Sequence, residues 1–213
     1  MKQIIAFTLL LALFACQRPV QPRESQKAFK QGMDYMLQGD SSPNYDYQRA
    51  RQCFRKAVRL DSTNMRAWRY QVVAEMNLAW HDSARQSVRM VLQQEELKGH
   101  KLEPHFYKVA GILEMLRDDK GSSRLYLEKA NKLYDERLEK DPDQQDAWLE
   151  NISVLCWLGR KEEALELANS IQIEKHERLT PQRLEVLHDF IRDWNTREML
   201  ENFRNPMVER AKI

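Results

Sequence analysis

The sequence predicts an all-α protein of about four stacked helix pairs, closed at its C-terminal end by a further helix. Two observations support this fold class. A short apolar pattern with helical spacing recurs four times along the 213-residue chain. The chain also has only six glycines and seven prolines, which disfavours an all-β fold because such folds need many turns.

The recurring pattern is a small residue followed four and seven places later by residues suited to packing. The four sets are Ala50/Phe54/Ala57, Ala84/Val88/Val91, Ser123/Leu127/Ala130 and Ala164/Ala168/Ile171. Positions four and seven apart lie on one face of a helix. Each set therefore predicts one helix that packs through this face.

An aromatic residue stands sixteen places before the small residue in three copies, at Trp68, Tyr107 and Trp148. In the first copy six extra residues (41–46) break that count, and skipping them puts Gly32, Tyr35 and Gly39 in the expected places. Each copy therefore predicts a pair of helices. The helix with the aromatic residue comes first along the chain, the helix with the small residue comes second, and the aromatics fill the gap between them.

This arrangement resembles the tetratricopeptide repeat (TPR), whose 34-residue unit has Trp, Tyr, Gly and Ala at fixed places. The match is strongest in the fourth copy, at Trp148, Leu155, Gly159 and Ala164, and covers about residues 25–172. The resemblance implies a right-handed α-α superhelix of TPR-like helix pairs.

The steps between successive small residues are 34, 39 and 41, and Val72 and Ile152 stand where the pattern has glycine. We therefore expect irregular curvature.

The C-terminal region predicts a helix that covers the last repeat. Thr180 is a good N-cap, and Pro181 suits the first helical position. One apolar stripe follows, surrounded by charged residues. The stripe consists of Leu184, Leu187, Ile191 and Trp194.

The N-terminus carries an apolar run, Ile4–Ala15, after a single lysine. The run is too short to span a bilayer and fits a secretory signal. The order Leu13-Phe14-Ala15-Cys16 resembles the lipobox of bacterial lipoproteins, which implies cleavage before Cys16 and acylation of that residue. The alternative is a cysteine that happens to end an ordinary signal peptide. By the same resemblance, Gln17 implies the outer membrane, on its periplasmic face.

These features divide the chain into four expected parts. They are a signal peptide at 1–15, a lipidated linker at 16–24, TPR-like repeats at 25–179, and a capping helix with tail at 180–213.

Charge is nearly balanced, with 34 Lys+Arg against 32 Asp+Glu, which argues against a nucleic-acid partner. Residues 16–100 carry 14 basic and 9 acidic side chains, whereas residues 101–213 carry 19 and 23. Within the basic half, Arg51, Arg55 and Arg59 are four apart on one predicted helix. We expect this stripe to lie near anionic lipid or an acidic partner, or to be solvated surface.

No catalytic constellation is evident. The five histidines form no metal-binding motif, and there is no phosphate-binding glycine loop or nucleophile elbow. We therefore expect no cofactor, no metal and no enzyme, with an enzyme of cryptic site as the weakest alternative. Cys53 and Cys156 are expected to be two separate buried thiols rather than a disulfide.

A sulfur residue recurs at one register of the first helix of each pair, at Met36, Met76, Met115 and Cys156. In the repeat family this register lies toward the concave groove, and flexible methionine suits adaptable binding. The alternative is plain helix packing. The expected partner-binding groove comprises Met33, Met36, Arg69, Val73, Met76, Ile112, Met115 and Cys156.

The groove does not resemble the family's charged clamp for C-terminal carboxylates. The matching places hold Phe29, Arg69, Lys108 and Leu149 instead of the Lys/Asn set.

Together these features predict a membrane-tethered adaptor that holds an envelope protein or peptide in its groove. The alternative is a structural subunit that stacks on copies of itself, and hence a homo-oligomer.

Overall fold

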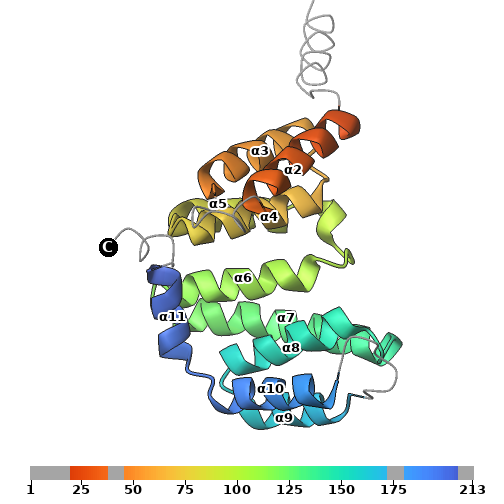
Figure 1. Ribbon diagram of the computed structural model, residues 1–213, viewed down its shortest axis with the longest axis vertical. Helices are drawn as coiled ribbons and strands as arrows, with labels where there is room; N and C mark the ends of the chain where they lie inside the picture. Colours follow the sequence, from red (N-terminus) through yellow and green to blue (C-terminus); the bar gives the residue numbers. More distant parts are fainter. Residues whose placement is uncertain (1–19, 38–45, 172–179, 206–213) are drawn as a thin grey trace, which may run out of the picture.

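The computed structural model describes residues 20–37, 46–171 and 180–205 (Figure 1). These residues form ten α-helices and one short 3₁₀ helix, and they contain no strand, so the predicted all-α fold is confirmed. The helices are α2 (Pro22–Leu37), α3 (Tyr47–Leu60), α4 (Met65–Asn77), α5 (His81–Leu92), α6 (Glu103–Met115), α7 (Lys120–Lys140), α8 (Gln145–Trp157), α9 (Lys161–Asn169), α10 (Pro181–Arg192) and α11 (Thr196–Arg204), with 3₁₀ helix η2 at Glu95–Leu97.

Successive helices from α2 to α10 pack against each other along the chain. Four TPR-like pairs result, α2/α3, α4/α5, α6/α7 and α8/α9, and Figure 1 shows them stacked along the long axis. The predicted signal segment, Cys16 and Gly39 lie outside the described residues. No helix among the described residues is long and apolar enough to cross a membrane.

The small residues mark the places where paired helices approach most closely. Ala50, Ala84, Ser123 and Ala164 are all fully buried, as the repeat pattern predicts. In the first pair the close approach also needs Gly32 on α2, because a Cβ there would stand only 2.6 Å from the Phe54 ring. The packing register is therefore confirmed in the first three copies and at Ala164 and Ala168 of the fourth, whereas Ile171 lies beyond the end of α9 and is only partly buried.

The predicted packing of an aromatic residue between the two helices is confirmed in two of the three copies. Trp68 and Trp148 are buried. In the third copy Tyr107 is only partly buried and faces Tyr126 of α7, with ring centroids 6.3 Å apart. The fully buried aromatic in that copy is Phe106, one residue earlier. A one-residue step rotates a helical position by about 100°, and a count along the sequence does not reveal which neighbour faces inward.

The turns within three pairs share one backbone geometry. Ala79, Asp118 and Gly159 each adopt a positive φ, of 54°, 61° and 76° respectively. The amide of each donates to the carbonyl three residues earlier, and the next amide donates to the carbonyl five residues before it. This is the Schellman arrangement that ends helices with a left-handed residue. Of these three turns, only the one in the fourth copy has the favoured glycine.

Buried ion pairs join successive helix pairs. Arg51 of α3 donates to the fully buried Glu75 of α4 at 2.8 Å. Arg85 of α5 lies 3.4 Å from Glu114 of α6 in the same way. Arg51 therefore differs from the exposed Arg55 and Arg59 of the predicted basic stripe, because its guanidinium neutralises an internal carboxylate.

The C-terminal region differs from the single capping helix that the sequence predicts. Thr180 does cap α10, accepting from the Arg183 amide, and α10 packs on α9. The chain then breaks at residues 193–195 and forms a second helix, α11, capped by Asn195. The break is stabilised because Trp194 is buried against Trp157, with ring centroids 5.0 Å apart.

Candidate functional site

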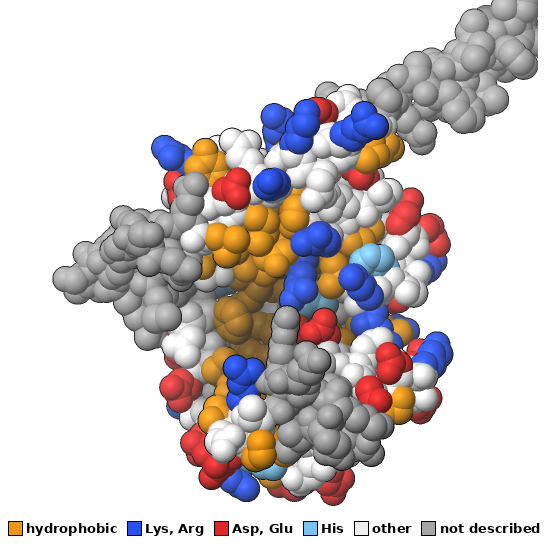
Figure 2. Space-filling view, turned by 45° about the vertical axis from the view of Figure 1, so that its right-hand side comes forward, with side chains coloured by type: hydrophobic (Ala, Val, Ile, Leu, Met, Phe, Trp, Pro, Cys, Tyr) orange, Lys and Arg blue, Asp and Glu red, His pale blue; other side chains and the backbone are white. Residues whose placement is uncertain are grey.

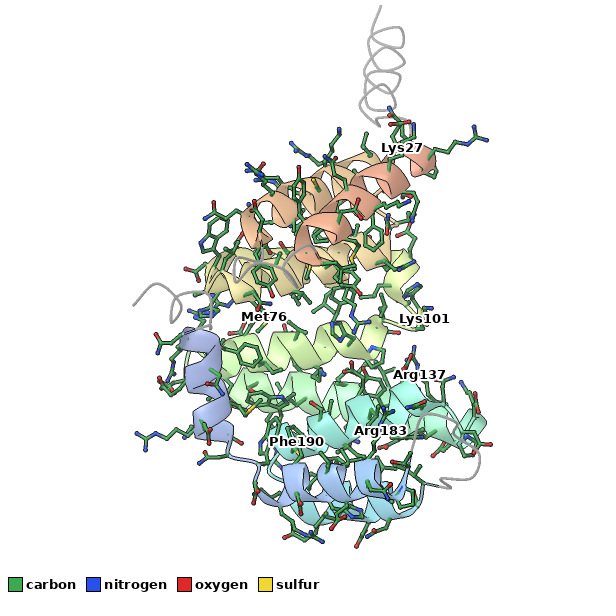
Figure 3. All side chains as sticks on the ribbon, in the orientation of Figure 1. Lys27, Met76, Lys101, Arg137, Arg183 and Phe190 are labelled. Carbon is green, nitrogen blue, oxygen red and sulfur yellow. The ribbon has the colours of Figure 1, made fainter. Side chains whose placement is uncertain are left out.

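One face of the molecule is hollowed (Figure 2). Figure 2 shows hydrophobic side chains gathered in this hollow, with Lys and Arg side chains beside it. Figure 3 places Met76 between α4 and α6, and places Lys101 and Arg137 toward the opposite end of the pairs. This face therefore offers an apolar part and a basic part.

The predicted groove residues divide into two groups by burial. Met33, Met36, Arg69, Val73 and Met115 are partly exposed and can be contacted from outside. Cys156 is fully buried, and Met76 and Ile112 expose only 7% and 5% of their surface. The expectation that these three lie on the groove surface is corrected, because they fill the space between stacked helices.

The carbonyl groups of Met76, Met115 and Cys156 accept the hydrogen bonds from the left-handed turn residues that follow. The recurring sulfur register therefore marks the last turn of each first helix. Its role in binding stays a prediction.

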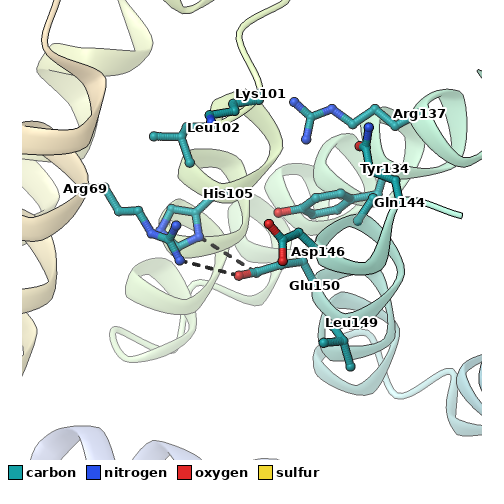
Figure 4. Close-up of a pocket in the computed structure, with 11 residues that line it drawn as sticks. Arg69, Lys101, Leu102, His105, Tyr134, Arg137, Gln144, Asp146, Leu149 and Glu150 are labelled. Carbon is teal, nitrogen blue, oxygen red and sulfur yellow. Dashed lines mark ion pairs between the residues drawn. The ribbon is translucent and has the colours of Figure 1, made fainter. Parts of the chain in front are cut away.

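The basic part of this face is a cleft of about 460 Å³ between α4, the segment before α6, α7 and α8 (Figure 4). Its lining comprises Arg69, Lys101, Leu102, His105, Tyr134, Arg137, Gln144, Asp146, Ala147, Leu149 and Glu150. Leu149 is 38% exposed at this cleft. The site can therefore contact apolar as well as charged groups.

Glu150 is the electrostatic centre of the cleft. Lys108 donates a hydrogen bond to its carboxylate, and Arg69 Nη2 lies 3.8 Å from Oε1. His105 Nδ1 lies 3.8 Å from Oε2. Burial alone would raise the pKa of Glu150, but the contact with His105 and the charge of Lys108 outweigh it. The pKa of Glu150 therefore lies below its usual range, and the side chain is ionised.

His105 is neutral near pH 7. Burial lowers the pKa of its imidazole, and the nearby charges of Lys108 and Arg69 act in the same direction, although Glu150 opposes them. The cleft thus holds four permanent cations, counting Lys108, against two carboxylates. The excess of positive charge favours an anionic ligand.

Two of the cations are available to a ligand. Lys101 is exposed at the mouth of the cleft. Arg137 donates to the carbonyl of His100 at 3.2 Å and lies 5.9 Å from the Tyr134 ring centroid, so its hydrogen-bond partner is a neutral group. Figure 4 shows Arg69, Lys101 and Arg137 around the opening. Burial raises the pKa of Tyr134, so its hydroxyl remains a neutral hydrogen-bonding group.

Sequence reasoning located part of this site. Arg69 belongs to the predicted groove, and Lys108 was identified only as a departure from the family's clamp. Lys101 and Arg137 lie outside the first helices, in the segment before α6 and on α7. The repeat register therefore carries no signal for them, and the fold alone brings them together.

Among the described residues no group of His, Cys, Asp or Glu could hold a metal ion. Cys53 and Cys156 are free thiols, as expected; Cys156 is buried as predicted, whereas Cys53 is only partly buried.

No protein-family model matches the chain, and no curated protein matches its sequence. Among solved structures, the crystal structure of the MamA protein is similar over 90% of this chain and 94% of that one. The identity is 14% and the TM-score 0.43. At that level the likeness carries no argument about the site, which depends on this chain's own residues.

Proposed function

We propose that this chain is a membrane-tethered scaffold of the bacterial envelope that binds an acidic segment of a partner protein on the hollowed face. The observation that carries the proposal is the cleft around Glu150, where Arg69, Lys101 and Arg137 surround an opening next to exposed Leu149.

The chemistry of the cleft suggests the kind of segment. Carboxylates of a partner would pair with Lys101 and Arg137, and apolar side chains beside them would cover Leu149 and the partly exposed surface of α4. Glu150 already occupies a carboxylate position among Lys108 and Arg69. Because these two cations are already paired, a partner's carboxylates would use Lys101 and Arg137.

The proposed membrane anchor is supported by the sequence alone. The order Leu13-Phe14-Ala15-Cys16 resembles a lipobox, and acyl chains on Cys16 would fix the body close to a membrane. Replacing Cys16 with Ala should abolish labelling by radioactive palmitate and leave the precursor uncut. Normal labelling of the variant would remove the tether from the proposal and leave the scaffold untouched.

The scaffold function is tested by capturing partner proteins from envelope extracts with this chain and identifying them by mass spectrometry. We expect the variant with Arg69→Gln, Lys101→Gln and Arg137→Gln to lose the captured protein. Arg89→Gln is the matched control, because Arg89 is exposed on α5 and lies outside the cleft. Equal capture by both variants would mean that the cleft does not bind the partner.

A second candidate is a structural subunit that stacks on copies of itself. Helix α10, which packs on the last helix pair, leaves Val186 and Phe190 exposed, at 68% and 46%. An apolar end of this kind could be covered by another copy. Light scattering over a range of concentrations tests it: Val186→Ser with Phe190→Ser should reduce any oligomer to the monomer, and an unchanged oligomer would exclude this end as the interface.

A further inference from the structure

The C-terminal helix α11 is attached less firmly than the other helices. None of its residues is buried. Its apolar residues Met199, Leu200 and Phe203 are only partly covered, although they pack against the core. The helix therefore contributes little burial to the fold while it covers apolar surface beneath it.

Helix α11 runs across the ends of the stacked pairs, at the left in Figure 1. The Phe203 ring lies 6.1 Å from that of Trp157 at the end of α8. The Phe203 carbonyl accepts a hydrogen bond of 3.0 Å from His81 Nε2 at the start of α5. These contacts connect the second pair to the fourth, away from the basic cleft.

The surface under α11 is not filled by it. An open cleft of about 770 Å³ lies between α11, the turn before α7 and the end of α8. On the repeats its lining combines charged residues of α7 with the apolar residues Met115, Leu127, Trp157 and Leu158, and with α11 in place Leu127 and Trp157 are buried. A helix with larger apolar side chains than those of α11 would fill more of this space and bury more surface.

We propose that α11 is a displaceable occupant of a helix-binding surface, and that an amphipathic helix of a partner protein takes its place. That helix would carry large apolar residues at the spacing of Leu200 and Phe203. The observed position of α11 on this surface shows which chemistry fits. This inference goes beyond the proposed function, since it concerns a different face and a helical ligand.

Displacement exposes no buried side chain of α11, because it has none, and a partner helix in the same place would cover the repeat surface again. As part of the same chain it competes at a high effective concentration, on the order of millimolar for a short linker. A partner helix would therefore bind weakly to the resting chain and more tightly once α11 is released. The connection to Asn195 would act as the hinge.

The test uses a fluorescein-labelled peptide with the sequence of residues 194–205 and the full chain purified in mild detergent. Phe203→Asp should release α11, and the variant should bind the peptide about tenfold or more tightly than the unaltered chain. A second variant, Leu200→Asp, should act in the same way. Equal binding by all three proteins would overturn the proposal, and so would loss of the folded body in both variants, because α11 would then be an integral part of the core.

The size of the partner's side chains is tested with a second peptide in which Trp replaces the residue matching Leu200. We expect this peptide to bind the Phe203→Asp chain about threefold or more tightly than the first, because it fills open space. Weaker binding would refute the fit. A dimer of the unaltered chain that the first peptide dissociates would identify a second copy as the occupant and would overturn the assignment to a different partner.

Discussion

The residues in the left-handed turns allow a prediction about stability. Changing glycine to alanine in one turn should lower the free energy of unfolding, and changing alanine to glycine in an equivalent turn should raise it. Gly159 has a φ of 76°, and a Cβ added there would meet no atom within 4 Å. The cost of Gly159→Ala is therefore backbone strain alone, about 1–2 kcal/mol. Reduced freedom of the unfolded chain offsets about 0.4–1 kcal/mol of it. We expect a net loss of roughly 0.5–1 kcal/mol in the free energy of unfolding.

The reverse change applies to Ala79, whose φ is 54°. Ala79→Gly removes similar strain and should gain roughly 0.5 kcal/mol after the entropic offset. The control is Gly121→Ala, because Gly121 lies in α7 and its added Cβ would meet only Asp119 Oδ1 at an ordinary 3.6 Å. That change should stabilise the chain.

Urea denaturation of the three variants and the unaltered chain measures all of these changes. If Gly159→Ala stabilises the chain as Gly121→Ala does, left-handed strain does not control the turns. A loss on Ala79→Gly would refute the reasoning equally.

Three further predictions concern buried groups. Arg51→Leu leaves a buried carboxylate without its cation and should cost about 3–5 kcal/mol in urea denaturation, whereas exposed Arg55→Leu should change stability by less than about 0.5 kcal/mol. Met76→Ser should lower stability by roughly 2–5 kcal/mol and Met115→Ser by less, since Met76 is buried and Met115 partly exposed; equal losses would contradict this. Because the pKa of His105 is lowered in the folded chain, the unfolded chain takes up more protons below about pH 6.5, so stability falls on acidification, and His105→Gln should reduce the fall between pH 7.5 and 5.

The repeat could be predicted from the sequence because its causes are local and periodic. Ala50, Ala84, Ser123 and Ala164 recur at positions where only a small residue allows two helices to approach, and each is fully buried. The N-cap at Thr180 was equally local, since its side chain bonds an amide three residues later.

What the sequence could not predict depends on contacts between distant segments. Arg51 has the spacing of an exposed stripe, and only the position of Glu75 on the next pair turns it inward. The break before α11 depends on Trp194 packing against Trp157. Both contacts join residues whose proximity is set by the stacking of pairs rather than by any sequence interval.

The candidate site shows the same division. Arg69 follows from the repeat register, because it lies on a first helix of the stack. Lys101 and Arg137 come from a connecting segment and a second helix, and they meet only because α6 and α7 pack side by side. Three of the four cations of the cleft, Lys101, Lys108 and Arg137, lie in residues 101–213, where acidic side chains outnumber basic ones. The net charge of that half therefore does not indicate a basic cleft.

The most direct test of the central claim is a titration of the ¹⁵N-labelled chain with two peptides, followed by NMR. The first peptide alternates Leu with pairs of Glu, and the second replaces each Glu by Gln. We predict that the acidic peptide shifts the amide signals of Lys101, His105, Tyr134 and Arg137 and that the neutral peptide does not. The variant with Gln at Arg69, Lys101 and Arg137 should bind the acidic peptide about 30-fold more weakly. Shifts centred on exposed Arg55 and Arg59 instead, or equal affinity for the two peptides, would contradict the assignment of the cleft as a site for acidic partners.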